Sequence, residues 1–208
     1  MAASAQVTTL PLQEWKAATE SPLLFYITGD GGFNDFSTGL CTAINKAGYA
    51  VSSLNAKSYF WNKKTALQTA TDIASYVAKQ FNGRQNQQLI LVGYSFGADV
   101  IPFVVNKLPD AMRKKVGAVI LLSPSGSTDL EIHFTDMFGG NKKRSMDVVA
   151  EINKMASPKT VTLFGSDETY FPVKDITLKN YINEVLPGGH HFDGNTAEVA
   201  KTIIRYFK

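Results

Sequence analysis

The sequence is poor in the residue types that bind metals and form disulfides, with a single cysteine and only three histidines among 208 residues. The lone Cys41 excludes an internal disulfide and a cysteine-based metal site. It lies in an apolar helical pattern, so we expect it in the core. The adjacent pair His190-His191 does not easily direct both rings to one ion, and no further His or Cys is placed to complete a set of ligands. We therefore expect neither a metal nor a cofactor.

The sequence also lacks a large excess of charge and a long apolar run. Charged residues make up 19% of the chain and the formal net charge is +3 at pH 7, which gives no strong field for nucleic acid. No run is long and apolar enough to span a membrane. The hydrophobic content of 44% is ordinary for a globular protein, and we predict a single domain over residues 1–208.

A secretory signal is not visible at the start of the chain. Residues 1–6 have neither the basic region nor the apolar core of a signal peptide. This pattern fits a cytoplasmic protein, and it fits equally a mature exported chain to which a start Met has been added.

Apolar runs of strand length alternate with helix-like stretches. This alternation predicts an α/β fold with a mainly parallel central sheet and helices on both faces. The predicted strands cover residues 23–28, 49–54, 89–92, 116–122, 160–164 and 181–186, and the predicted helices cover 36–47, 65–81, 98–108 and 196–207. The least regular stretch, 124–157, is expected to form at most a small cap.

The most informative motif is Gly93-Tyr94-Ser95-Phe96-Gly97, which joins the apolar run 89–92 to the helical run 98–108. A serine at the apex of a sharp strand-to-helix turn is typical of the nucleophile elbow of α/β-hydrolases. The two glycines are needed because side chains at their positions would collide with the neighbouring strand or helix. Ser95 is therefore the predicted nucleophile, in an α/β-hydrolase fold.

The predicted acid and base follow later strands, at the edge where the carboxyl ends of parallel strands meet. The chain order Ser, acid, His is that of the α/β-hydrolase triad. We predict Asp167 as the acid that orients the base and His191 as the base. Glu168 is the alternative acid, and His190 is the alternative base or else a structural or substrate-binding residue.

The glycine-rich turn 29–32 follows another predicted strand. The backbone N–H of Phe96 and an N–H of Asp30 or Gly31 are the expected donors of an oxyanion hole. The alternative is a plain tight turn. A phosphate loop is excluded because the Lys-Ser/Thr ending is missing.

Beyond these motifs, the chain resembles the family of the bacterial virulence protein VirJ and the carboxyl-terminal domain of AcvB. The segments that carry the resemblance are residues 28–33, 58–61, 93–102, 106–109, 131–133 and 186–194. The strings Ser-Phe-Gly-Ala-Asp-Val and Gly-Gly-His-His-Phe-Asp-Gly are the most specific. Two departures are the missing export signal and Phe33, where the family commonly has Trp.

The resemblance implies a periplasmic α/β-hydrolase that cleaves aminoacylated phosphatidylglycerol, lysyl-phosphatidylglycerol in particular, at the membrane surface. Members are tied to virulence and type IV secretion, so secretion-system proteins are candidate partners. The family's Ser, acid and His map to Ser95, Asp167 and His191. A generic carboxylesterase or thioesterase acting on soluble acyl substrates is the alternative enzyme. The alternative to an enzyme is a binding or scaffold protein that turns over no substrate.

A lysyl ester carries two positive charges near the scissile carbonyl, so its pocket needs carboxylates. Asp30 and Glu131 are our candidates for substrate binding, together with His190. Alternatively, Asp30 stabilises its turn and Glu131 forms an internal salt bridge. A set of large apolar residues is expected either in the core or in an apolar rim for glycerolipid: Phe33, Phe36, Tyr59, Phe60, Trp61, Phe134, Met137 and Phe138.

Overall fold

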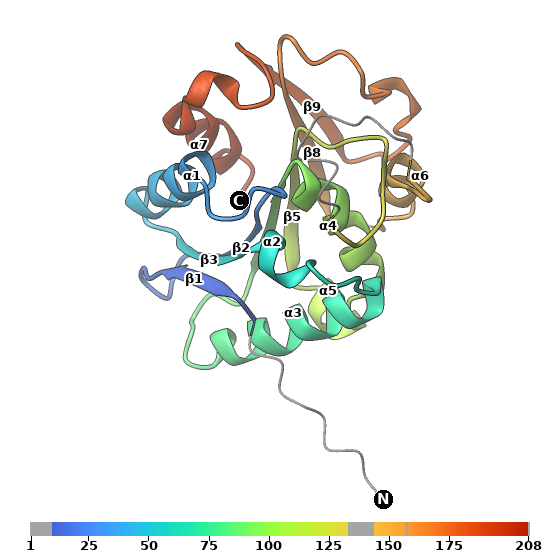
Figure 1. Cartoon of the computed structure of the whole chain (residues 1–208). Coiled ribbons are helices and arrows are strands. Elements are labelled where there is room, and N and C mark those ends of the chain that lie inside the picture. Colours follow the sequence, from blue (N-terminus) through green and yellow to red (C-terminus); the bar gives the residue numbers. More distant parts are fainter. Residues whose placement is uncertain (1–9, 133–143, 157, 208) are drawn as a thin grey trace, which may run out of the picture.

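The computed structural model describes residues 10–132, 144–156 and 158–207. Its centre is a seven-stranded sheet with the strand order β1-β3-β2-β4-β5-β8-β9 (Figure 1). At one edge β1 pairs antiparallel with β3, and every other neighbouring pair in this sheet is parallel. The strands are β1 (Leu12–Trp15), β2 (Leu23–Ile27), β3 (Ala50–Leu54), β4 (Leu89–Tyr94), β5 (Val116–Leu122), β8 (Lys159–Gly165) and β9 (Tyr181–Leu186).

Helices cover both faces of the sheet, as predicted (Figure 1). On one face lie α1 (Asp35–Lys46) and α7 (Thr196–Ile204); on the other lie α3 (Ala66–Phe81), α4 (Phe96–Lys107) and α6 (Val148–Asn153). Strand side chains alternate between the two cores: Leu24 and Tyr26 of β2 face the α1–α7 layer, whereas Phe25 and Ile27 face the α3–α4 layer. Strands buried on both faces explain the continuous apolar runs in the sequence.

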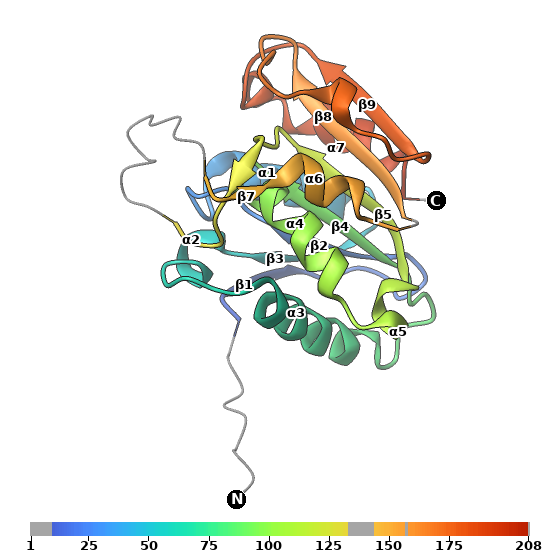
Figure 2. The ribbon, with the colours of Figure 1, turned by 90° about the vertical axis from the view of Figure 1, so that its right-hand side faces the viewer.

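The stretch 124–157, predicted to be the least regular, contains short elements that the sequence pattern did not reveal. β6 (Ser127–Thr128) pairs antiparallel with β7 (Met146–Asp147), and α6 follows directly. Figure 2 shows α6 lying along α4. The Asn106 side-chain amide on α4 donates to the backbone oxygen of Glu151 at 2.9 Å and to its carboxylate at 3.0 Å. This part of the stretch therefore covers the sheet-bound helix α4; residues 133–143 and 157 lie outside the described residues.

The parallel topology determines where loops gather. Six neighbouring strands, β3 to β9, end at the same edge of the sheet. The turn after β2, the short helix α2 (Ala56–Tyr59) after β3, the start of α4 and the loops after β5, β8 and β9 all lie at this carboxyl edge. Further short helices among the described residues are α5 (Asp110–Arg113), η2 (Val173–Asp175) and η3 (Phe192–Gly194). Within the described ranges, no helix has the length and apolarity needed to cross a membrane.

Candidate active site

Ser95 sits at the apex of a strained turn between β4 and α4. Its φ of 52° and ψ of −120° are unusual for a residue with a side chain. A Cβ on Gly93 would lie 2.4 Å from the Gly97 carbonyl oxygen, and a Cβ on Gly97 would lie 2.2 Å from the Ile27 carbonyl oxygen. Both contacts are with backbone and allow no side chain, so the structure has the elbow that the motif predicts.

The imidazole that meets Ser95 is that of His190. Its Nε2 lies 2.9 Å from the Ser95 hydroxyl oxygen, and its Nδ1 lies 2.7 Å from Oε1 of Glu168. An ionised carboxylate only accepts hydrogen bonds, so Nδ1 carries the proton and donates it to Glu168. In the neutral ring, Nε2 is then left with a free lone pair that accepts the Ser95 hydroxyl hydrogen. The three side chains form a chain of hydrogen bonds with the polarity that a serine nucleophile requires.

Glu168 is held as an ionised acceptor by four hydrogen bonds. Oε1 accepts from His190 and from the Tyr170 hydroxyl at 2.7 Å; Oε2 accepts from the Ser123 hydroxyl at 2.6 Å and the Gly165 N–H at 2.8 Å. Burial of the carboxyl favours its neutral form, but these bonds outweigh burial and lower the pKa of Glu168 to about 2. Ser123 itself takes a positive φ of 49°, so the loop after β5 is strained where its hydroxyl reaches the acid.

The prediction of Asp167 as the acid is wrong in geometry, since Glu168 occupies that place. The Asp167 N–H donates to the Gly188 carbonyl at 3.1 Å, and the Glu168 N–H donates to the Gly165 carbonyl at 3.0 Å. The latter bond closes a turn after β8 that directs the Glu168 side chain back toward the strand end. Asp167 is exposed, and its carboxylate accepts from the Ser166 hydroxyl at 3.1 Å.

The prediction of His191 as the base is wrong for a similar reason. Phe192 is only 1% exposed and packs on Phe36 in the α1–α7 core. Anchoring this ring turns the chain, so the two preceding side chains point in different directions. His190 faces Ser95, whereas the exposed His191 places Nδ1 3.0 Å from the Tyr94 hydroxyl. Tyr94 also donates to the His190 carbonyl at 3.1 Å and so ties the histidine loop to the elbow.

The glycine-rich turn after β2 lies against the nucleophile. A Cβ on Gly29 would be 3.4 Å from the Ser95 Cβ, and the Gly32 N–H closes the turn on the Gly29 carbonyl at 3.0 Å. At the start of α4, the Phe96 N–H belongs to the first turn of a helix, where N–H groups have no partner within the helix. Oxyanion donation by Phe96, Asp30 and Gly31 stays a prediction that this placement supports.

A buried carboxylate lies one turn beyond Ser95. Asp99 is 6% exposed and accepts 2.6 Å hydrogen bonds from both the N–H and the hydroxyl of Ser125. Burial raises the pKa of Asp99 to about 7; the bonds from Ser125 and the charge of His190 lower it, and the charge of Asp30 raises it. The Ser125 hydroxyl also lies 2.9 Å from the Ser127 carbonyl. The single hydroxyl hydrogen of Ser125 cannot bond well to both the Asp99 carboxylate and the Ser127 carbonyl. A protonated Asp99 instead donates to the Ser125 oxygen, and the Ser125 hydrogen is then free to bond the Ser127 carbonyl.

The two acidic residues predicted to bind substrate lie in different loops. Asp30 is half-buried, and its charge raises the pKa of Tyr94 and Asp99, which places it electrostatically within the site. Glu131 is half-buried on the segment after β6, and its N–H bonds to the Asp129 carbonyl. Substrate binding by both residues stays a prediction.

The predicted apolar rim divides into core and surface. Phe36, Tyr59 and Phe60 are buried, Phe33 is half-buried and Trp61 is 55% exposed. Phe134, Met137 and Phe138 lie outside the described residues, as does the third histidine, His133.

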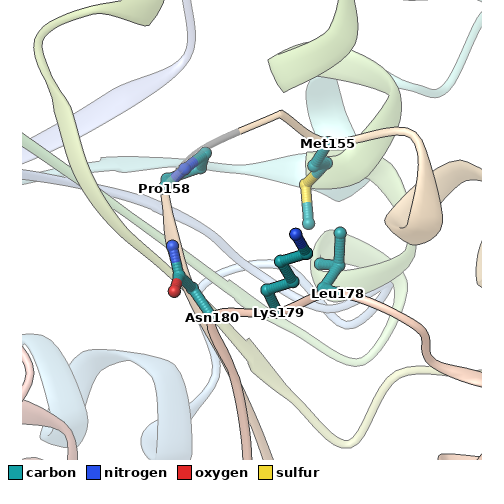
Figure 3. A pocket seen from close by; sticks show the side chains of 5 residues that line it. All are labelled: Met155, Pro158, Leu178, Lys179 and Asn180. Carbon is teal, nitrogen blue, oxygen red and sulfur yellow. The ribbon is translucent and has the colours of Figure 1, made fainter.

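A cavity of about 240 Å³ opens elsewhere, at the amino ends of β8 and β9 (Figure 3). It is lined by Met155, Pro158, Leu178, Lys179 and Asn180. Strand β8 separates this end of the sheet from Glu168 by its seven-residue length, roughly 20 Å, so the cavity is not part of the Ser95 site. The described residues also contain no group of three or more His, Cys, Asp and Glu side chains that could hold a metal ion.

Sequence reasoning missed the residues that support the acid. Tyr170 and Ser123 both donate to Glu168, and Asp99 anchors the loop that carries Ser123. Asp99 lies in the string Ser-Phe-Gly-Ala-Asp-Val that carries the family resemblance and in the first turn after the elbow, but neither signal gave it a role. No local pattern indicated Tyr170 or Ser123, because their role depends on the packing of β5 beside β8.

Comparisons with known proteins agree with this architecture. The sequence profile of the family described as "Bacterial virulence protein (VirJ)" matches residues 22–208. Est1E from Butyrivibrio proteoclasticus is 17% identical with a TM-score of 0.65, over 94% of this chain and 90% of Est1E. MenH from S. aureus is 12% identical with a TM-score of 0.70, over 94% and 97%. The thioesterase domain from the curacin biosynthetic pathway is 15% identical with a TM-score of 0.61, over 93% and 94%.

These likenesses establish the α/β-hydrolase fold predicted from the elbow motif. Among curated protein sequences, none matches the chain.

Proposed function

The chain belongs to the VirJ family of bacterial virulence proteins, and on this premise we propose that it is a serine hydrolase that cleaves the aminoacyl ester of aminoacylated phosphatidylglycerol, with lysyl-phosphatidylglycerol as the favoured substrate. The observation that carries the proposal is the hydrogen-bonded chain from Ser95 through His190 to Glu168 at the carboxyl edge of the sheet. The acid and the base are those of the structure, in place of Asp167 and His191.

In the first half-reaction, the Ser95 oxygen attacks the acyl carbonyl while its proton moves to Nε2 of His190. Glu168 stabilises the resulting imidazolium and keeps Nδ1 protonated. The oxyanion of the tetrahedral intermediate accepts hydrogen bonds from the Phe96 N–H and from the turn at Asp30 and Gly31. When the carbon–oxygen bond to the glycerol breaks, the leaving alkoxide takes the proton from Nε2.

In the second half-reaction, water attacks the aminoacyl ester of Ser95 while His190 takes its proton. Collapse of the second tetrahedral intermediate returns that proton to the Ser95 oxygen. The products are the free amino acid and phosphatidylglycerol, so one water molecule is consumed and the lipid regains its anionic form. No metal or cofactor takes part in the proposed reaction.

The charge around the site suits a cationic acyl group. Asp30 and Glu168 lie close enough to the elbow to act electrostatically on Tyr94, and an aminoacyl ester brings an ammonium group next to the carbonyl. Asp30 is the carboxylate proposed to bind an ammonium. Asp30→Asn is therefore expected to raise KM for a lysyl ester more than KM for a neutral acyl ester. Equal changes in KM for the two esters contradict that role.

The direct test measures amino acid released from lysyl-, alanyl- and unmodified phosphatidylglycerol. We expect release from lysyl-phosphatidylglycerol by the native protein and a loss on the order of 10⁶-fold in kcat for Ser95→Ala. If the protein hydrolyses soluble esters or thioesters but releases no amino acid from either aminoacylated lipid, it is a serine esterase and the proposed lipid substrate is wrong.

The scaffold alternative is tested in cells with the same variant. Full cellular function of Ser95→Ala assigns the protein a non-enzymatic role, because the nucleophile is then dispensable. The proposed place of action is the periplasm, beside the membrane and the secretion-system proteins with which the family is associated.

A further inference from the structure

The segment that joins α2 to α3 exposes a large aromatic side chain at the carboxyl edge of the sheet. Trp61 is 55% exposed, and Leu67, in the first turn of α3, is 61% exposed. The preceding residue, Phe60, is completely buried, and its ring meets that of Phe96 at a centroid distance of 5.2 Å. Since Phe96 directly follows Ser95, the segment that carries Trp61 packs against the elbow.

The backbone holds this segment in place on both sides of Trp61. The Phe60 carbonyl accepts from the Ile132 N–H at 2.9 Å, and the Lys64 N–H donates to the Leu130 carbonyl at 2.9 Å. Trp61 is thus exposed on a hydrogen-bonded turn. An exposed tryptophan ring leaves a large apolar surface in contact with water, which is unfavourable, and here the ring gains no packing inside the protein in return. Such a ring on a fixed backbone points to a partner surface.

The segment itself is basic; the carboxylates beside it are Asp72, which accepts from the Tyr59 hydroxyl at 2.6 Å, and the half-buried Glu131 between Leu130 and Ile132. Between Asp35 and Asp72 the sequence contains no acidic residue. Within this stretch Lys57, Lys63 and Lys64 flank the tryptophan; Lys63 is exposed, and Lys64 places its ammonium 5.1 Å from the centre of the Tyr59 ring. We name Lys57, Trp61, Lys63, Lys64 and Leu67 the Trp61 surface.

Basic side chains beside an exposed tryptophan match the interface of an anionic bilayer. Tryptophan favours the headgroup level, where its ring is partly apolar and its N–H is hydrated, and lysines near an anionic leaflet are attracted to it. A protein partner of acidic character satisfies the lysines as well, but it does not require the tryptophan and the active-site edge to lie side by side. In Figure 2, α2 lies at the same end of the molecule as β7, beside the start of α4.

We propose that the Trp61 surface docks the protein on an anionic phospholipid bilayer and brings the Ser95 site to headgroup level. The inference rests on the proposed function, because a lipid ester is cleaved where headgroups meet the site. Docking itself requires no turnover, so it is measurable with vesicles that contain no aminoacylated lipid.

The first experiment compares binding of the full chain to vesicles of phosphatidylglycerol mixed with phosphatidylcholine and to vesicles of phosphatidylcholine alone. We expect binding to the anionic vesicles only. Lys63→Gln/Lys64→Gln is expected to weaken it on the order of 25-fold, about five-fold per lysine. The matched control is Lys79→Gln/Lys107→Gln, which removes the same charge from the exposed last turns of α3 and α4, at the opposite edge. The control is expected to bind within two-fold of the native protein.

The second experiment uses the tryptophan as its own reporter. The chain has two tryptophans, and Trp15→Phe leaves Trp61 as the only one. Its emission is expected to shift to shorter wavelength with anionic vesicles and to stay unchanged with phosphatidylcholine vesicles, because the ring leaves water. Equal weakening by both lysine pairs, or an unchanged emission, overturns the proposal. Concentration-dependent dimerisation that Trp61→Ser abolishes assigns the surface to a second copy and also overturns it.

Docking and catalysis fail in distinguishable ways. A protein that hydrolyses lysyl-phosphatidylglycerol in detergent micelles but does not bind anionic vesicles contradicts docking and leaves the proposed function intact. A protein that binds anionic vesicles through the Trp61 surface but hydrolyses no ester contradicts the proposed function alone. If both hold, Lys63→Gln/Lys64→Gln hydrolyses a soluble ester at the native rate and loses activity on vesicle-presented substrate.

Discussion

Replacing Glu168 by Gln tests the assignment of the acid, because the two oxygens of Glu168 have different partners. Oε2 accepts from the Ser123 hydroxyl and from the Gly165 N–H. In Glu168→Gln the amide oxygen must take this place, since two donors meet there. The amide NH₂ then faces Nδ1 of His190 and donates to it. The ring is forced into the tautomer with its proton on Nε2, where it no longer accepts the proton of Ser95.

The expected magnitude follows from this tautomer change. In a well-studied serine protease, the equivalent substitution of the orienting carboxylate lowers kcat by about 10⁴, which corresponds to about 5 kcal/mol of transition-state stabilisation. We expect a loss of that order for Glu168→Gln, with KM little changed because the acid does not touch substrate. The assay is steady-state hydrolysis of a soluble ester, after thermal melting has shown that the variant is folded.

The matched control is Asp167→Asn, which removes the neighbouring carboxylate. Asp167 is exposed, and among the described residues its carboxylate accepts a hydrogen bond only from the Ser166 hydroxyl, so kcat is expected to stay within about two-fold. A loss of 10³-fold or more in Asp167→Asn, with Glu168→Gln near the native rate, refutes the reasoning.

Two further predictions concern the elbow and the buried carboxylate beside it. Gly97→Ala places a Cβ 2.2 Å from backbone and is expected to destabilise the fold by about 3 kcal/mol and lower Tm by roughly 10 °C. The control Gly126→Ala has open space around the new Cβ and should melt like the native protein. Equal Tm values for the two variants contradict the steric argument. Folding raises the pKa of Asp99 from 3.8 to about 7, so between these pH values the folded state holds more protons than the unfolded state. The free energy of unfolding therefore falls by about 4 kcal/mol as pH rises through that range. Urea unfolding at pH 5 and pH 8 spans about 3 kcal/mol of this fall. Asp99→Asn keeps the hydrogen bonds of Ser125 and is expected to remove it; identical pH dependence in both proteins contradicts a raised pKa.

The elements that the sequence predicted well depend on local chemistry. The elbow follows from Gly93 and Gly97, whose need for space is visible in the motif itself, and the central strands follow from continuous apolar runs. Strand β1 was not predicted, because its four residues are mostly half-exposed at an antiparallel edge and leave no such run. The two-residue strands at 127–128 and 146–147 were missed because their pairing joins parts of the chain that are about twenty residues apart.

The acid and base were predicted to within one residue, and each error has the same origin. Adjacent residues in a turn point in different directions, and the direction is set by a core contact at the histidines and by the exact turn geometry at the carboxylates. Burial of Phe192 decides between the two histidines, and the hydrogen bond from the Glu168 N–H to Gly165 decides between the two carboxylates. Neither contact is encoded in the motif that contains the residue.

The central claim is that His190 activates Ser95 as a nucleophile. A fluorophosphonate reports this directly, because its phosphorus is attacked by an activated serine oxygen, and mass spectrometry of the labelled peptide identifies the residue. We predict that Ser95 is labelled in the native protein and in His191→Ala, and that His190→Ala lowers the labelling rate on the order of 10³-fold or more. Labelling of a different serine, or loss of labelling in His191→Ala but not in His190→Ala, contradicts the account.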